Sequence, residues 1–476
     1  MDKRVAILSS HLSDVDAMLP VLRARQFFNL SDSYLRYIQL YMEGEMEKGL
    51  KQDGYGTLPM LPSFVLKPQS NGHNMGGVFY AIDMGGTNLR VLRIEIDRNG
   101  SALAPPTQLT FHIPVRYLSD TAQELFKFIG KCVAAFTQSH PGDVENVEKT
   151  GKPISVGFTF SFPTIQKGLA VAQLLTWTKG FKTTGMEGAN IVTLLQKGIE
   201  ANDIKYLRVV ALCNDTVGTL IAKFLFDPSV HIGCILGTGS NACYWEKVSN
   251  IKKLSLNAEL QKELNARKMD DNLEMVVNIE WGNLGSDAGN TILKTTPYDQ
   301  HVDNISCNPG RQRLEKMISG YYIGELVRYV LRDIFRGNPT IWHKMQQKDC
   351  FPPVLVSRIL TDESAKLRWI HLWLNEELDI NVEDLEDRRI IKEVCVMVRN
   401  RSATLSATAL ASILKRSRHC HEHVTIAVDG SVYEKMPGYK TKLYETMRDV
   451  YCIKGVNLTL SKDGSGIGAA YIAAIS

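Results

Sequence analysis

The feature that most constrains this chain is a glycine turn between two apolar segments. Residues 78–82 form an apolar run typical of a buried strand, and the run ends at Asp83. Gly85 and Gly86 follow, and residues 89–96 then alternate as a returning strand does. A glycine turn brings bare backbone N–H groups close to a ligand, because no side chain blocks the approach. The stretch predicts a hairpin suited to phosphate, although a plain hairpin beside an acidic residue fits it as well.

A second stretch repeats this pattern further along the chain. Residues 235–241 read ILGTGSN and mirror residues 81–88, AIDMGGTN, as an apolar strand followed by glycines around a hydroxyl. This weak internal duplication predicts two lobes that each place one glycine hairpin beside shared phosphates. Strands alternate with helical patterns elsewhere, which is typical of an α/β protein. We expect strands at 109–115, 154–160, 207–213, 231–244 and 424–428, and helices at 14–26, 31–50, 121–136, 190–201, 216–226, 317–335 and 387–414.

The composition excludes several classes of function. The 476 residues are too many for one ordinary core and favour two or three domains. A net charge of +4 argues against a dedicated nucleic-acid or membrane-surface protein. No run of 18 apolar residues occurs, so no membrane span is expected. The nine cysteines lack C-x-x-C spacing, which favours buried thiols in a reducing compartment over disulfides or a zinc site.

Small and acidic residues follow four strand ends in a fixed order, and a fifth such segment opens the last helix. The five segments are Asp83-x-Gly-Gly-Thr, Asn214-Asp215-Thr, Gly237-Thr-Gly-Ser-Asn, Asp429-Gly-Ser and Asp463-Gly-Ser-Gly. This order resembles that of the hexokinases, within the actin-like sugar-kinase superfamily. There the five sites are the first phosphate, first connecting, second phosphate, adenosine and second connecting motifs.

Further segments strengthen the resemblance over most of the chain. Those that look like hexokinase signatures are MLPSFV (60–65), FTFSFP (158–163), LTWTKGF (175–181), CNDTVGT (213–219), GTGSNACY (237–244), NIEWG (278–282) and NPGRQRLEKMISG (308–320). The resemblance implies an α/β fold of two lobes, the actin-like ATPase (ribonuclease H-like) fold of hexokinase type, with a cleft between a small and a large domain. The small domain is expected at 70–213 plus 463–476, and the large domain at 1–69 plus 214–462.

The resemblance also implies an activity, ATP-dependent phosphorylation of a D-hexose, mainly glucose, at the 6-hydroxyl, as the first step of glycolysis. ATP and Mg²⁺ would be the cofactors. Asp215 aligns with the hexokinase general base, which accepts the proton of the attacking hydroxyl. Without the resemblance, an Asp in this position is better explained as a helix N-cap.

Polar side chains are expected to surround the sugar, because amides and carboxylates suit a polyol whose hydroxyls both donate and accept. At the positions that look like hexokinase glucose contacts stand Ser161, Thr178, Lys179, Asn214, Asp215, Asn241, Glu280, Gln312 and Glu315. The alternative for Glu280 and Glu315 is a solvated surface carboxylate, but apolar neighbours argue against it.

The nucleotide would lie between the two glycine turns. Asp83 is expected to position Mg²⁺ through water. Arg90 either assists or points outward as a surface arginine. The phosphates would be lined by Gly85, Gly86, Thr87 and Asn88 on one side and by Thr238 and Gly239 on the other, and the adenosine by Asp429, Gly430, Ser431, Gly464, Ser465 and Gly466.

The N-terminus carries a pattern that bears on location. Within residues 4–12, an Arg-Val pair and a His-Leu pair are separated by five residues, which looks like a peroxisomal import signal. If the signal is used, an import receptor is a partner and the chain resembles single-unit glycosomal hexokinases of kinetoplastids. Otherwise the cytoplasm is expected, with these residues as a packed helix.

Other functions fit the sequence less well than phosphotransfer. A catalytically silent sugar sensor or regulatory protein of the same fold usually loses the base or a phosphate glycine, and both are intact here. The zinc motif C-x-C-G-x-x-G-C of repressor-like sugar kinases is absent. An assembly ATPase like actin would lack the sugar-contact segments, and a Rossmann dehydrogenase would open a helix after its glycines. The sequence leaves open the oligomeric state and the choice among glucose, mannose and fructose.

Overall fold

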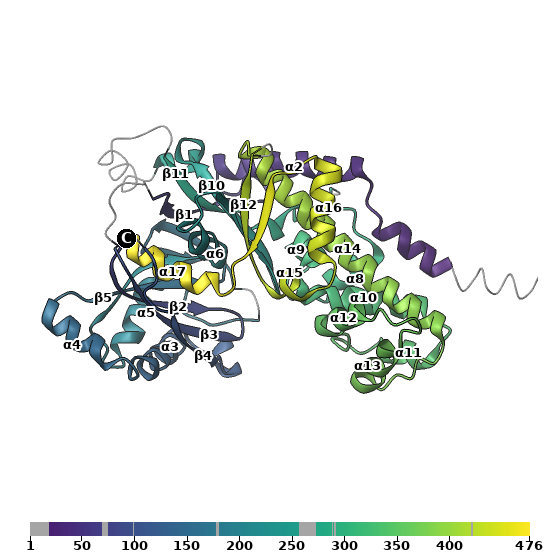
Figure 1. Cartoon of the computed structure of the whole chain (residues 1–476), viewed down its shortest axis with the longest axis horizontal. Coiled ribbons are helices and arrows are strands. Elements are labelled where there is room, and N and C mark those ends of the chain that lie inside the picture. The colour runs from purple at the N-terminus through teal and green to yellow at the C-terminus, as the bar shows by residue number, and fades with distance from the viewer. Residues whose placement is uncertain are drawn as a thin grey trace, which may run out of the picture.

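The computed structural model describes residues 19–68, 75–98, 100–177, 180–256, 273–287, 289, 292–419 and 422–476. Two sheets form its frame, the first at the lower left of Figure 1 and the second at its upper centre. The strand order in the first sheet is β4 (Thr107–His112), β3 (Asn88–Ile96), β2 (Gly77–Met84), β5 (Ile154–Phe160) and β8 (Leu207–Cys213). In the second it is β1 (Leu61–Leu66), β11 (Glu274–Asn278), β10 (Ser240–Lys247), β9 (Val230–Leu236), β12 (Val424–Asp429) and β13 (Val456–Leu460).

The two sheets repeat one pattern of strand pairing. In the first sheet β2, β3 and β4 are antiparallel neighbours, and β5 and β8 extend the other side of β2 in parallel. In the second sheet β9, β10 and β11 are antiparallel neighbours, and β12 and β13 extend the other side of β9 in parallel. β1 is an additional antiparallel edge strand. The predicted duplication therefore extends from the two glycine turns to the whole sheets, and β2–β3 and β9–β10 are equivalent hairpins.

Each half ends in a helix that packs on the sheet of the other half. α6 (Asp215–Phe224) follows β8 directly and packs on β9, β10 and β12. α17 (Gly464–Ile475) follows β13 and packs on β2, β3 and β5. The two helices cross closely because glycines lie at the crossing, where a Cβ on Gly468 would come within 1.9 Å of the carbonyl oxygen of Gly218. The N-termini of both helices, which carry predicted site residues, are therefore held by both halves.

Helices cover the outer faces of both sheets (Figure 1). The first half contains η1 (Val115–Leu118), α3 (Ala122–Thr137), α4 (Pro141–Thr150), the hairpin β6 (Thr164–Gly168) and β7 (Val171–Leu174), and α5 (Ile191–Glu200). The second half contains a helix at 19–28, α2 (Asp32–Lys51), η2 (Val248–Asn250), η3 (Lys252–Leu256), η4 (Trp281–Asn283), α8 (Pro297–Ile305), α9 (Arg313–Ile318), α10 (Gly320–Ile334), α11 (Pro339–Lys344), α12 (Pro353–Thr361), α13 (Arg368–Leu378), α14 (Leu385–Arg416), α15 (Ser431–Lys435) and α16 (Tyr439–Tyr451).

Most elements expected from sequence are confirmed, with ends that move by a few residues. The strands at 154–160 and 207–213 have the expected bounds, and Ser31 caps α2 through its side chain. Residues 317–335 were expected as one helix, but Ser319 is extended (φ −80°, ψ 151°) and separates α9 from α10. Part of the helix expected at 14–26 lies outside the described residues.

Candidate active site

The carboxylate of the first glycine turn is buried and paired. Asp83 is 5% exposed at the end of β2. Its Oδ2 accepts hydrogen bonds from Arg90 Nη2 at 2.5 Å and from Ser465 Oγ at 2.8 Å. Arg90 also donates to the carboxylate of Asp463 through Nη1. The outward-facing alternative for Arg90 is therefore wrong, because this side chain ties β3 to the start of α17.

The second glycine turn is held by backbone contacts. The N–H of Gly320, at the start of α10, donates to the carbonyl of Gly237 at 2.8 Å. The next N–H, of Tyr321, donates to the carbonyl of Thr238 at 3.1 Å. On another side, Gly430 lies so close that a Cβ there would come within 2.6 Å of the Gly237 nitrogen. The turn is thus fixed by α10 and by the end of β12.

Asp215 is the first residue of α6 but does not cap it. The N-cap is Asn214, whose Oδ1 accepts from the Thr216 N–H at 3.0 Å. Asn214 and Thr216 are buried, whereas Asp215 is half-buried. Burial raises the pKa of the Cys213 thiol to about 12, and the nearby carboxylates of Asp83 and Asp215 add to the effect. The N-cap alternative for Asp215 is wrong, and the carboxylates of Asp215 and Asp83 both act on the Cys213 thiol at the end of β8.

Electrostatic coupling links residues from both ends of the chain. Burial raises the pKa of the Asp429 carboxyl to about 6. The guanidinium of Arg90 opposes this shift, whereas the carboxylates of Asp463 and Asp215 add to it. The expected base, the expected adenosine border and the arginine of the first turn therefore share one electrostatic environment. Asp463 was missed as a site residue, although its position in the last glycine segment is a usable signal.

Amides and a carboxylate gather at the ends of β10 and β11. Nδ2 of Asn241 donates to Oδ1 of Asn278 at 2.9 Å and to Oε1 of Glu280 at 3.1 Å. Nδ2 of Asn278 donates to the same Glu280 oxygen at 2.9 Å. Glu280 is only 9% exposed, so the surface-carboxylate alternative is wrong for it. Asn278 was also missed as a site residue, although an amide at the end of an apolar strand is a usable signal.

α9 brings a second carboxylate to the second turn. A Cβ on Gly239 would lie 3.4 Å from Oε1 of Glu315, and a Cβ on Gly282 would lie 2.9 Å from its Oε2. Gln312 precedes α9 in a left-handed conformation (φ 49°), and its Oε1 accepts from Asn308 Nδ2 at 2.7 Å. Glu315 therefore lies between the second glycine turn and the segment that follows Glu280.

The remaining predicted residues lie at the same strand ends, apart from two. The N–H of Ser161, just after β5, donates to the carbonyl of Met84 at 3.2 Å, beside the first turn. A Cβ on Gly466 would lie 3.7 Å from the Cβ of Asp83, which places the start of α17 against that turn. Thr178 and Lys179 lie outside the described residues. Of the others, Gly85, Gly86, Thr87 and Asn88 connect β2 to β3, Gly430 and Ser431 begin α15, and Gly464 begins α17.

The donor set around the first turn fits Mg²⁺ held through water. Arg90 and Ser465 both donate to Oδ2 of Asp83, and a water-mediated ion leaves these two contacts in place. Among the described residues, no group of three or more His, Cys, Asp or Glu side chains is arranged to hold a metal ion. In enzymes that use nucleotides, Mg²⁺ is usually bound by one or two carboxylates together with the substrate phosphates.

Sequence comparison relates this chain to proteins of known family. Two family models, both described as Hexokinase, match residues 21–224 and 231–475. The chain is 36% identical over 475 residues to Hexokinase-2 of Rattus norvegicus, covering 95% of this chain and 48% of that protein. It is 34% identical over 460 residues to Hexokinase-1 of Homo sapiens, covering 94% of this chain and 47% of that protein. The chain spans about half the length of the curated relatives it matches.

Solved structures show the same architecture. A hexokinase from Schistosoma mansoni, complexed with glucose, superposes with a TM-score of 0.82 at 33% identity and covers 97% of this chain and 99% of that one. Another crystal structure described as hexokinase has a TM-score of 0.76 at 28% identity, covering 96% and 99%. The predicted α/β fold, the two-lobed actin-like sugar-kinase fold of hexokinase type, is confirmed. In the part of the chain that the structure describes, no helix is long and apolar enough to cross a bilayer.

Proposed function

Because this chain belongs to the hexokinase family, we propose that it transfers the γ-phosphate of ATP to the 6-hydroxyl of a D-hexose, mainly glucose, as the first step of glycolysis. The observation that carries the proposal is the position of Asp215. This residue is half-buried at the start of α6, its carboxylate acts together with that of Asp83 on the Cys213 thiol, and it is coupled electrostatically to Asp429 beside the second turn. The related Schistosoma hexokinase is complexed with glucose, which supports a hexose as the acceptor.

The proposed chemistry begins at the sugar. Asp215 accepts the proton of the attacking hydroxyl, a contribution typically worth roughly 10²–10⁴-fold in rate. Asn241 and Glu280, already joined by a hydrogen bond of 3.1 Å, hold sugar hydroxyls, and Glu315 approaches from α9. Such a site rejects analogues that lack a hydroxyl, because its own buried polar groups would be left unpaired.

The proposed nucleotide site uses both hairpins. Mg²⁺, when bound with ATP, neutralises charge on the transferred phosphate. Asp83, held by Arg90 and Ser465, orients that ion through water. The glycine turns let backbone N–H groups approach the phosphates, with Gly85 on one side and Gly239 on the other. Closure of the two lobes on the sugar would exclude water that could otherwise accept phosphate.

Replacing the base tests the proposal directly. Asp215→Ala is expected to lower kcat by roughly three orders of magnitude while glucose binding stays measurable by calorimetry. A matched control is Glu148→Ala, an exposed carboxylate on α4, which should keep wild-type turnover. Near-normal turnover of Asp215→Ala would remove the mechanism. Glucose binding without any turnover in the wild-type chain would favour the silent sugar sensor instead.

The division into domains is a further proposal. We place the small domain at 70–213 plus 463–476 and the large domain at 1–69 plus 214–462. The packing of α17 on β2, β3 and β5 supports joining the last helix to the first sheet. Small-angle scattering with and without glucose would test the closure that this division implies, and identical curves would contradict it.

Location is proposed from the sequence alone. The pairs Arg4-Val5 and His11-Leu12 lie outside the described residues, and their spacing supports import into a glycosome. A fluorescent fusion of residues 1–15 should become punctate in kinetoplastid cells, and a fusion carrying Arg4→Ala should stay diffuse. A diffuse wild-type fusion would contradict import and favour a cytoplasmic location.

A further inference from the structure

A hollow of about 870 Å³ lies between helix 19–28, α8, α10 and α11. Its volume is within the usual range of small-molecule sites, roughly 300–1,000 Å³. The side chains that line it are mainly aromatic rings and guanidinium groups. None of them belongs to the proposed phosphotransfer site, so the hollow needs an explanation of its own.

Positive charge predominates in this hollow. Three arginines, Arg23, Arg332 and Arg336, line it together with a single carboxylate, Asp333. Arg336 pairs with Asp333 at 2.7 Å, and the hydroxyl of Tyr298 donates to the same carboxylate at 2.9 Å. Within the described residues, neither Arg23 nor Arg332 forms an ion pair with a carboxylate. Among the described residues, these two guanidinium charges of the hollow therefore have no carboxylate partner.

Flat side chains accompany these charges. The ring of His301 lies parallel to that of Tyr329, with centroids 5.1 Å apart and planes 7° apart. The guanidinium of Arg332 lies 4.6 Å from the centre of the same tyrosine ring, which holds the arginine in place. His301 is exposed and Trp342, on α11, is half-buried, so both of these lining rings are accessible from the hollow. Accessible aromatic rings suit an aromatic ligand, which can stack on them.

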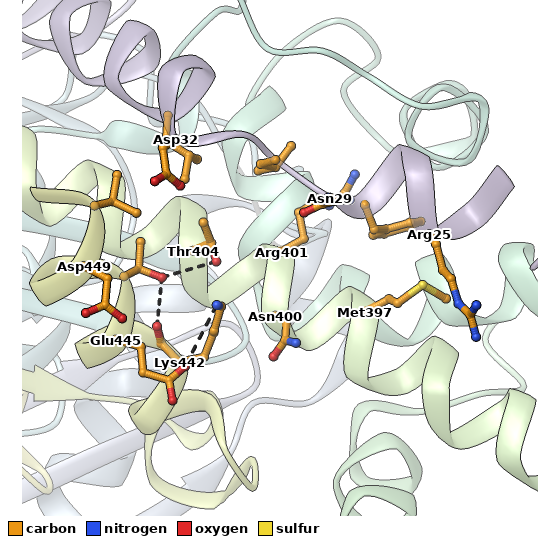
Figure 2. A pocket seen from close by; sticks show the side chains of 15 residues that line it. Arg25, Asn29, Asp32, Met397, Asn400, Arg401, Thr404, Lys442, Glu445 and Asp449 are labelled. Atoms are coloured by element: carbon orange, nitrogen blue, oxygen red, sulfur yellow. Dashed lines mark hydrogen bonds and ion pairs between the residues drawn. The ribbon is translucent and has the colours of Figure 1, made fainter. Parts of the chain in front are cut away.

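A second hollow lacks this excess of positive charge. This hollow, whose lining side chains Figure 2 draws, lies between helix 19–28, α2, α14 and α16. Its volume is about 450 Å³. Its two arginines are already neutralised, since Arg25 pairs with Glu393 at 2.5 Å and Arg401 pairs with Asp299 at 2.6 Å. Further carboxylates, including Asp449, line it. Anions are not expected there, although the two hollows share one wall, helix 19–28.

We propose that the hollow between helix 19–28 and α10 binds a nucleoside phosphate, at a site separate from the proposed phosphotransfer site. Guanidinium groups bind phosphate through paired, charge-assisted hydrogen bonds, which Arg23 and Arg332 supply. A nucleic-acid base stacks favourably on an aromatic side chain, whatever the identity of the base. Inorganic phosphate would leave the rings unused, and a neutral aromatic ligand would leave the charges unused. A ligand that carries both groups uses the whole hollow.

Calorimetric titration of the full chain with ADP, at saturating glucose, tests the inference by counting sites. The wild-type chain is expected to bind two ADP molecules, one at the proposed phosphotransfer site and one in the hollow. Each guanidinium–phosphate bond is worth roughly tenfold in affinity. The double variant Arg23→Gln, Arg332→Gln should therefore bind ADP in the hollow about 100-fold more weakly. Arg389→Gln, at an arginine 58% exposed on α14, is the matched control and should keep both sites.

The outcomes separate this inference from the proposed function. The inference would be overturned if the double variant still bound two ADP molecules. It would also be overturned if the wild-type chain bound one ADP molecule and the double variant kept that site. A single wild-type site that the double variant loses would support the inference and contradict the proposed phosphotransfer site. Arg23→Gln alone, at an exposed side chain, gives the same test if the double variant does not fold. Pyrophosphate that binds the hollow as tightly as ADP would overturn the aromatic part of the inference.

Discussion

The β2–β3 and β9–β10 hairpins share a sequence pattern and a pairing pattern, but different contacts hold their turns. At the first turn, side-chain charges add to backbone hydrogen bonds: Arg90 joins the carboxylates of Asp83 and Asp463, and the Ile113 N–H donates to the Thr87 carbonyl at 2.9 Å. Among the described residues, backbone contacts hold the second turn without such an ion pair: Gly320 donates to the carbonyl of Gly237, and Gly430 packs against the turn.

This difference suggests how two copies of one hairpin take different tasks. Side-chain ion pairs can exchange partners when a charged ligand arrives, because the charges stay satisfied throughout. Backbone packed without intervening side chains cannot move without losing contact or colliding. We therefore expect the first turn to adapt to phosphate and the second to act as a fixed support. The three predictions below test that division.

The largest effect is expected at the second turn. Gly430 has φ +118°, and a Cβ there would lie 2.4 Å from the backbone of Leu236. Gly430→Ala should therefore lower the free energy of unfolding in urea by about 3 kcal/mol or more, because strain and overlap add. In the first turn, a Cβ on Gly85 meets its nearest atom at 3.6 Å. Gly85→Ala is the matched control, with a loss under about 1 kcal/mol. Equal losses would contradict the contrast.

A smaller effect is expected from the ion pairs of the first turn. Arg90→Met leaves the buried carboxylate of Asp83 without its cation, which should cost about 2–3 kcal/mol of unfolding free energy. The side chain of Arg90 is 24% exposed, so the figure lies below that for a fully buried pair. Asp463→Asn keeps the Arg90–Asp83 pair and should cost under about 1 kcal/mol. A larger loss for Asp463→Asn than for Arg90→Met would show that Asp83 is not the main partner.

The smallest effect is expected at Asp429, a carboxylate at the end of β12 and beside the second turn. Burial raises its pKa from 3.8 to about 6, so between these pH values the folded chain keeps a proton that the unfolded chain releases. Stability from this group is therefore lost as pH rises through that window. Asp429→Asn cannot ionise and should melt a few degrees higher than wild type above pH 6, without nucleotide. The difference should vanish near pH 4, and a difference that is independent of pH would contradict the burial argument.

Local patterns predicted much of this fold and part of the site. The apolar runs before Asp83, Asp215 and Asp429 predicted strands, and the structure has β2, β8 and β12 there. Short elements with weak periodicity, such as α4 and α11, were missed because few of their residues are buried. Asn278 and Asp463 were missed for another reason, since their partners are remote in sequence: Asp463 binds Arg90, 373 positions away.

The order of strands, turns and helix starts follows from the amino-acid sequence itself, because hydrophobic periodicity and glycine placement act over a few neighbouring residues. The exchange of α6 and α17 between the two halves, the pairing of Arg90 and the gathering of arginines in the hollow beside α10 do not follow from it. They depend on which surfaces pack together after the elements have formed. Burial and charge pairing are properties of that packing, so only the tertiary structure decided them.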